Sequence, residues 1–279
     1  MTILKFKRTL LQVFCIAASA LFVFPIVLML VKSFSVDGIE NYKLVFDSFN
    51  LMENFASSVL IVGCTLVLVA VVISLAAFAF SKLEFPLKKT LYYVILMGLM
   101  IPVSALIFPL FHTVKSMGML GSRLSVVLPY VTLNCCFSLM MFKNYFDSLP
   151  DQLMEAAYID GAGMLRIFSS IMMPIAKPGL AFVLIQTFLN AWNELQMAMI
   201  FISDQSRLPI SVIPIRFAAS ATSTKFPTQV MFAALTICLF PIAVFYIFCI
   251  KIPDFRLNAG SGERVRLFLK NHAERLLKR

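Results

Sequence analysis

The chain has 279 residues, of which 60% are hydrophobic and only 14% are charged, and its mean hydropathy is +0.90. These values exclude a water-soluble domain and predict a polytopic membrane protein. The formal net charge of +10 would suit nucleic-acid binding in a soluble protein. In a membrane protein the position of each charge matters more than the total, so no nucleic-acid partner is expected.

Six apolar runs approach the length of about 20 residues that a membrane-spanning helix needs. In chain order they lie at residues 9–31, 59–80, 91–111, 124–142, 180–202 and 230–250. They predict an all-α fold, with one six-helix domain over residues 1–250 and a tail at 251–279. The third run carries Pro102 and Pro109, and the fifth carries polar residues near its end.

The first run raises the question of a signal peptide. It follows a cluster of basic residues and contains Ala18-Ser19-Ala20, which is similar to a cleavage site. Because the run continues without a break to Val31, we expect a retained first helix. If the N-terminus is cytoplasmic, most of the 24 Lys and Arg residues lie on the inner side. The positive-inside rule therefore predicts that both termini are cytoplasmic.

The longest inner segment, residues 143–179, contains a short predicted helix at 151–160. Ser148 is a candidate N-cap, Pro150 suits the first turn, and Asp151 follows the cap by three residues. Gly161 and Gly163 supply the stop, because glycine can leave a helix at positive φ. A helix of this length is unstable alone in water, so it must pack against something.

One face of this helix presents Leu153, Ala156 and Ala157, and Glu155 lies at the rim. Small alanine side chains let another backbone approach closely, so the helix is interpreted as a docking element. The prolines at 174 and 178 are expected to end one helix and to set the direction of the fifth spanning helix. A force on the docking element would then reach that helix through a stiff connection.

The segment "SLPDQLMEAAYIDGAGMLRIFSSIMMPIAKPGL" resembles the EAA loop of permease subunits of bacterial ABC importers. That pattern is E-A-A, three residues, G, nine residues, then I-x-L-P, and a Met at 173 takes the place of the usual Leu. The resemblance implies that coupling to an ATPase is carried by Glu155, Ala156, Ala157, Asp160, Gly161, Ile171 and Pro174.

Three further segments, "AAFAFSKLEFPLKK", "MIPVSALIFPLF" and "FLNAWNELQMAMIF", are similar to the second permease subunit of maltose-type carbohydrate importers. The resemblance covers roughly residues 9–250. It implies a type I importer fold in the bacterial inner membrane and three partners: a homologous second permease, an ATPase dimer, and an extracytoplasmic sugar-binding protein. No cofactor is expected in this chain, because ATP and Mg would be bound by the ATPase subunits.

Polar residues in the fifth run predict the substrate cavity. An ionisable residue in a spanning segment is costly and usually faces an aqueous cavity or the bundle interior, which singles out Glu194. Asn190 lies four residues before it on the same helix face, Asn193 is adjacent, and the ring of Trp192 could stack on a sugar. The alternative is that these polar groups form hydrogen bonds between helices.

The sequence gives little support for nucleotide binding, metal binding or catalysis. The chain has no GxxxxGK[ST] motif for nucleotide phosphates, and His112 and His272 lack the spacing of a metal or catalytic site. Six Cys residues lie in or at the ends of apolar runs, without CxxC spacing, and are interpreted as core or lipid-facing residues. The chain is therefore expected to be a transport subunit and not an enzyme.

The tail at 251–279 departs from the resemblance, because it is longer and more basic than usual. Three interpretations stay open: a basic amphipathic helix on the inner membrane surface, an unstructured tail, or a change of coding frame that replaced the usual ending. For the whole chain, the alternative function is a self-contained secondary transporter or channel driven by an ion gradient, with Glu194 as its ion site.

Overall fold

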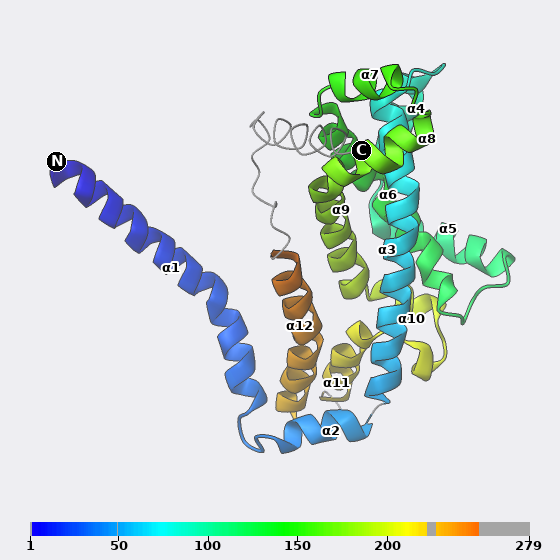
Figure 1. Cartoon of the computed structure of the whole chain (residues 1–279). Helices are drawn as coiled ribbons and strands as arrows, with labels where there is room; N and C mark the ends of the chain where they lie inside the picture. Colours follow the sequence, from blue (N-terminus) through cyan, green and yellow to red (C-terminus); the bar gives the residue numbers. More distant parts are fainter. Residues whose placement is uncertain (1, 49, 222–226, 251–279) are drawn as a thin grey trace, which may run out of the picture.

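The computed structural model describes residues 2–48, 50–221 and 227–250, and these residues form helices joined by short loops (Figure 1). In chain order the elements are α1 (Thr2–Ser33), α2 (Glu40–Ser48), α3 (Leu51–Lys82), α4 (Lys88–Met97), η1 (Gly98–Met100), α5 (Val103–Ser116), α6 (Leu124–Asp147), α7 (Gln152–Ile159), α8 (Met164–Arg166), η2 (Ile167–Met172), α9 (Met173–Asn193), α10 (Gln196–Phe201), η3 (Gln205–Arg207), η4 (Ile210–Val212), α11 (Ile213–Ala221) and α12 (Thr228–Ile250). The predicted tail at 251–279 lies outside the described residues.

Within the described ranges, five single helices are long and apolar enough to cross a membrane, and one bent pair adds a sixth span. This confirms the predicted all-α fold with six spanning segments. The second span is longer than predicted, since α3 already begins at Leu51, eight residues before the apolar run.

The third span is not one straight helix. The helices on either side of Pro102 meet at 106°, whereas the sequence predicted a single span over 91–111. Proline lacks an amide proton and forces the preceding residue out of the helical region. Ile101 accordingly has φ −87° and ψ 119°, which is extended. Pro109, in contrast, lies inside α5 without ending it.

The fifth span also differs from the prediction. Helical backbone runs from Met164 through the π-helix η2 into α9 and stops at Asn193, whereas the predicted run was 180–202. The expectation that Pro174 and Pro178 end a helix is wrong. Pro174 lies in the first turn of α9, where proline is tolerated, and Pro178 lies inside the same helix. The last part of the apolar run forms the separate helix α10.

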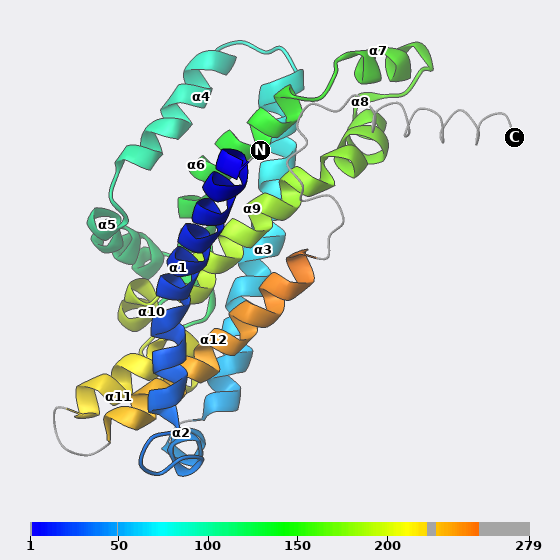
Figure 2. The same ribbon diagram turned by 90° about the vertical axis from the view of Figure 1, so that its left-hand side faces the viewer.

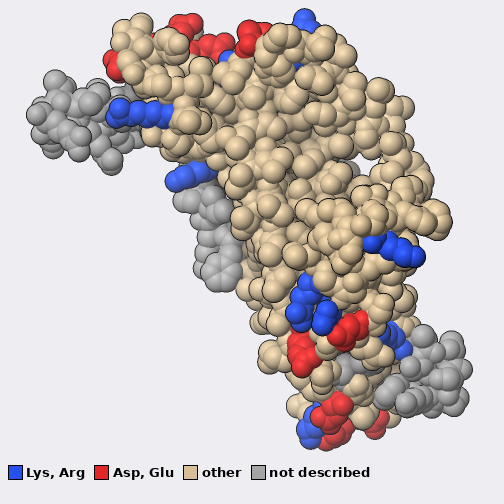
Figure 3. Space-filling model, turned by 90° about the vertical axis from the view of Figure 1, so that its right-hand side faces the viewer, with Lys and Arg blue, Asp and Glu red and all other residues tan. Residues whose placement is uncertain are grey.

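Helices α3, α6 and α9 pack against one another at the centre of the molecule, while α1 packs mainly on α12 and diverges from the rest toward its N-terminal end (Figures 1 and 2). The short helix α7 lies at one end of the bundle, and α2 lies at the other. Two buried apolar clusters fill the interior, one toward α7 and one toward α2, α10 and α11. Charged side chains gather toward the two ends of the face in Figure 3, with a broad uncharged band over most of the surface between them.

Candidate coupling helix and substrate cavity

The first candidate site is α7, which is one residue shorter at each end than the predicted helix 151–160. Ser148 is not its N-cap. That hydroxyl donates to the carbonyl of Tyr145 at 2.6 Å and so belongs to the end of α6. Asp151 takes the capping position, but its side chain makes no capping hydrogen bond. The carboxylate contacts Lys82 instead.

Of the two glycines predicted to end α7, only Gly161 does so. Gly161 has φ +75°, and its amide donates to the carbonyl of Tyr158 at 3.0 Å. The amide of Ala162 donates to Ala157 at 3.0 Å, which completes a Schellman-type stop. Gly163 has φ −69°, so its backbone needs no glycine there.

The faces of α7 are divided differently from the expected docking face. Leu153 and Ala157 are buried in their own chain, and Ala157 belongs to the apolar cluster toward this end of the bundle. Ala156 and Glu155 are exposed, together with Tyr158 and Ile159, the last with 86% of its surface accessible. The exposed face of α7 therefore carries Glu155, Ala156, Tyr158 and Ile159, whereas Leu153 and Ala157 of the predicted docking face are buried against the rest of the chain.

The other residues assigned to coupling lie nearby. Asp160 is exposed at the C-terminal end of α7. Ile171 and Pro174 are half-buried on η2 and at the start of α9, and Ile171 packs against the same apolar cluster as α7. Ile171 and Pro174 therefore connect α7 to the fifth span and are not part of the exposed face of α7.

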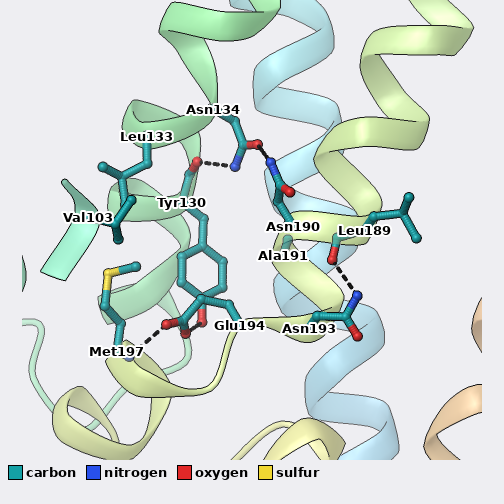
Figure 4. Close-up of a pocket in the computed structure, with 10 residues that line it drawn as sticks. All are labelled: Val103, Tyr130, Leu133, Asn134, Leu189, Asn190, Ala191, Asn193, Glu194 and Met197. Atoms are coloured by element: carbon teal, nitrogen blue, oxygen red, sulfur yellow. Dashed lines mark hydrogen bonds between the residues drawn. The ribbon is translucent and has the colours of Figure 1, made fainter. Parts of the chain in front are cut away.

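The second candidate site is a cavity of about 450 Å³ between α6, α9 and α10 (Figure 4). Three of the predicted cavity residues line it: Asn190, Asn193 and Glu194. Its remaining wall is formed by Val103, Tyr130, Leu133, Asn134, Leu189, Ala191 and Met197. Polar groups thus share the wall of the cavity with apolar side chains, which is typical of ligand pockets.

Glu194 lies just beyond α9, with extended backbone (φ −69°, ψ 131°), and not within a spanning helix as predicted. The hydroxyl of Tyr130 donates to its carboxylate. The amides of Met197 and Ala198 also donate to it, at 2.8 and 3.3 Å. Since these are the free amides at the start of α10, the carboxylate joins α6, α9 and α10 at one corner of the cavity.

A chain of side-chain hydrogen bonds continues along the cavity wall. The amide of Asn190 donates to the side-chain oxygen of Asn134 at 2.9 Å, and Asn134 donates to the carbonyl of Tyr130 at 2.8 Å. Sequence reasoning missed Tyr130 and Asn134. They lie four residues apart in the fourth apolar run, so the spacing that linked Asn190 to Glu194 would also have linked them.

Trp192 does not line the cavity. Its side chain is 4% exposed, its ring stacks on Phe188 with centroids 5.4 Å apart, and the edge of Phe55 packs against it. The indole nitrogen donates to the carbonyl of Cys238 at 3.4 Å. The predicted role in sugar stacking is therefore not met in this structure, because the tryptophan points from α9 into the apolar core.

The loop that follows α10 is hydrogen-bonded to the start of α3. Asn54 donates to the carbonyls of Gln205 and Leu208 at 2.9 and 2.7 Å, and the amide of Ile210 donates to Ser58 at 2.7 Å. Within this loop, hydrogen bonds from Ser206 lower the pKa of Asp204. The loop thus holds an ionised carboxylate at neutral pH.

Neither candidate site contains a recognisable reaction centre. In the described part of the chain, no group of three or more His, Cys, Asp or Glu residues is close enough to hold a metal ion. The thiols of Cys15, Cys64, Cys135, Cys136 and Cys238 are free.

Comparison with known proteins gives the chain its relatives. Residues 70–259 match the family described as binding-protein-dependent transport system inner membrane component. The chain is 34% identical over 209 residues to the diacetylchitobiose uptake system permease protein NgcG of Streptomyces coelicolor, covering 74% of this chain and 68% of that protein. It is 35% identical over 173 residues to the sn-glycerol-3-phosphate transport system permease protein UgpE of Yersinia enterocolitica, covering 61% of this chain and 60% of that protein.

Among solved structures, a bacterial ABC transporter involved in the import of the acidic polysaccharide alginate has a similar fold. The TM-score is 0.75 at 20% identity, and the superposition covers 89% of this chain and 96% of the other. The family match spans more than half of the chain, and the sequence likeness to a permease extends over about three quarters of it. The chain belongs to the family of binding-protein-dependent transport system inner membrane components.

Proposed function

We propose that the chain is one permease subunit of an ABC importer that carries a sugar or oligosaccharide across the bacterial inner membrane. The observation that carries this proposal is α7: an E-A-A helix held on the bundle by Leu153 and Ala157, with Glu155, Ala156 and Tyr158 exposed at the end of the molecule. Such a helix suits insertion into another protein, and the family supplies the kind of assembly.

In this proposal a homologous permease completes the cavity, an extracytoplasmic binding protein delivers the sugar, and two ATPase subunits bind ATP and Mg. Nucleotide-driven closure of the ATPases moves α7 and reorients the cavity from one side of the membrane to the other, as in alternating access. Both termini are assigned to the cytoplasm. The sugar class rests on the carbohydrate relative and on the amide-lined cavity.

The ion-gradient alternative requires Glu194 to exchange a proton or an ion. The carboxylate instead accepts hydrogen bonds from Tyr130 and from the amides of α10, and the alternative offers no role for α7. Copurification of an ATPase with this chain, and loss of uptake when the catalytic residue of that ATPase is replaced, would support the importer. Uptake that survives this replacement and collapses with an uncoupler would overturn it.

The substrate is best identified through the binding protein. A thermal-shift screen of that protein against mono- and oligosaccharides would reveal the ligand, because a bound ligand stabilises the folded state. Stabilisation by a sugar is expected. Stabilisation by amino acids or metal ions alone would contradict the carbohydrate assignment.

A further inference from the structure

Lys82, the last residue of α3, connects that helix to the start of α7. Its side chain is only 5% exposed. The ammonium group donates to the carbonyl of Leu149 at 2.8 Å and to the carboxylate of Asp151 at 2.6 Å. Both acceptors lie in the short connection between α6 and α7, so one side chain from the second span holds the segment that leads into the coupling helix.

The burial of this lysine makes the contact specific. A buried ammonium group is costly unless it is paired and hydrogen-bonded, so the two acceptors determine where the side chain can lie. Asp151 is 76% exposed on its side chain, whereas Leu149 is 9% exposed and packs in the apolar cluster beneath α7. Lys82 therefore binds the buried part of the connection at the carbonyl of Leu149 and the exposed part at the carboxylate of Asp151.

A neighbouring bond strengthens the same junction. The hydroxyl of Ser81 donates to the carboxylate of Asp147 at 2.6 Å, which ties α3 to the end of α6. Farther along α7, Ala157 belongs to the same buried apolar cluster as Phe78 of α3. The connection that leads into α7 is thus hydrogen-bonded to α3, while α7 itself contacts the π-helix that leads into α9.

The opposite end of α3 holds the loop that follows α10. The proposed orientation places this loop on the outer side of the membrane, and it is called the outer loop below. Asn54 and Ser58 bind the backbone of residues 205–210 there. The helix between has no proline and spans 32 residues, which corresponds to a length of about 48 Å at 1.5 Å per residue. A single stiff element therefore contacts the segment beside α7 at one end and the outer loop beside the cavity at the other.

We propose that Lys82 is a positioning residue that couples α7 to α3, so that movement of α7 is passed through α3 to the outer loop as well as directly into α9. This inference rests on the proposed function. It adds a second transmission route, carried by a residue outside the EAA loop. Lys82 touches neither the ATPase face of α7 nor the cavity, and it acts through the α6–α7 connection.

The test measures how closely sugar uptake is coupled to ATP hydrolysis, separately from the rate of either process. The assembled importer, in proteoliposomes with its binding protein, is assayed for phosphate release from ATP and for uptake of the radiolabelled oligosaccharide found in the thermal-shift screen. The readout is the number of sugar molecules carried per ATP hydrolysed. Lys82→Met is expected to lower this ratio about tenfold, within the range of ordinary allosteric coupling. Asp151→Asn is expected to lower it less, and Lys82→Arg is expected to keep it within about twofold of the wild type, since the cation is retained.

Lys88→Met is the matched control. Lys88 pairs with Glu84 at 3.0 Å and donates to the carbonyl of Ser81 at the same end of the bundle, without touching the α6–α7 connection. Its ratio should equal that of the wild type. An unchanged ratio in Lys82→Met, or an equal loss in Lys88→Met, overturns the proposal.

If the importer with Lys82→Met does not assemble, the Asp151→Asn variant tests the proposal, because this substitution changes only an exposed carboxylate. A lowered ratio then supports the proposal, and an unchanged one overturns it. Failure of the wild type itself to take up sugar with ATP would instead overturn the proposed function, so the two failures are distinguishable.

Discussion

Three consecutive residues at the end of α9 have three different environments. Trp192 points into the core, whereas Asn193 and Glu194 line the cavity, where Glu194 also binds the start of α10. Successive residues of a helix are about 100° apart, which separates Trp192 from Asn193, and Glu194 lies beyond the helical end of α9. Their different surroundings predict different results from substitution.

Asn193→Ala is expected to reduce uptake roughly two- to tenfold, the value of one ordinary hydrogen bond, while the complex still assembles. The Asn193 amide donates only to the carbonyl of Leu189 in its own helix, so its removal leaves the packing intact. Initial rates of radiolabelled uptake measure the effect. Unchanged kinetics in both Asn193→Ala and Glu194→Gln would remove these residues from the substrate site.

Trp192→Ala is expected to act on stability instead. Truncating a buried aromatic side chain typically costs about 3–5 kcal/mol. The detergent-purified protein should therefore unfold at a clearly lower temperature, which a thermal-stability assay on size-exclusion peaks would show. A variant with normal stability and selectively lost uptake would place the indole at the substrate after all.

Gly179 of α9 lies close to Tyr145 of α6. A Cβ atom at this position would lie 2.5 Å from Cγ of Tyr145, the ring carbon bonded to the Cβ of that tyrosine. Gly179→Ala is therefore expected to destabilise the protein by about 1–3 kcal/mol through overpacking. Gly63→Ala in α3 is the control, because its Cβ meets nothing within 4 Å. Equal melting temperatures for the two variants would contradict this packing.

Individual residues show how much of the candidate cavity could be predicted from the sequence. The cost of a polar group in an apolar run singled out Asn190, Asn193 and Glu194, and all three line the same cavity. The same reasoning misplaced Trp192, because an aromatic side chain suits an apolar core and a sugar site equally well. Which way it points is decided by Phe188 and Phe55, which no local pattern reveals.

At the scale of elements, α7 could be predicted almost to its ends, whereas the third and fifth spans could not. The glycine stop and the apolar spacing of α7 are local signals. The 106° bend at Pro102 and the continuation of the helix through Pro178 depend on what surrounds each proline. Proline restricts φ in the same way at both sites, so tertiary packing decides between a break and a continuous helix.

The two glycines after α7 give a matched test of its end. Gly161→Ala places a side chain at φ +75° and is expected to destabilise the stop by about 1–2 kcal/mol. Gly163→Ala should be nearly neutral, because φ is −69° and its Cβ meets nothing within 4 Å. Hydrogen exchange of the Ala162 amide, which bonds to Ala157, reports on the stop. Faster exchange only in Gly161→Ala is the expected result, and equal rates would contradict it.

At the scale of the whole molecule, α7 and α2 lie at opposite ends of the spanning helices (Figure 1). The six spans and their order follow from hydropathy alone. The cavity does not, because its wall combines residues from α5, α6, α9 and α10, which are distant in sequence.

The assigned orientation can be tested with two exposed positions in a cysteine-free background. Ile159 on α7 is 86% exposed, and Val36 in the α1–α2 connection at the opposite end is 84% exposed. Since the excess of Lys and Arg assigns the α7 end to the cytoplasm, a membrane-impermeant maleimide should label Val36→Cys in intact spheroplasts and Ile159→Cys only in inside-out vesicles. Val72→Cys, in the middle of α3, should resist labelling from either side. Labelling of Ile159→Cys in intact spheroplasts would invert the topology and place the E-A-A helix where no ATPase could reach it.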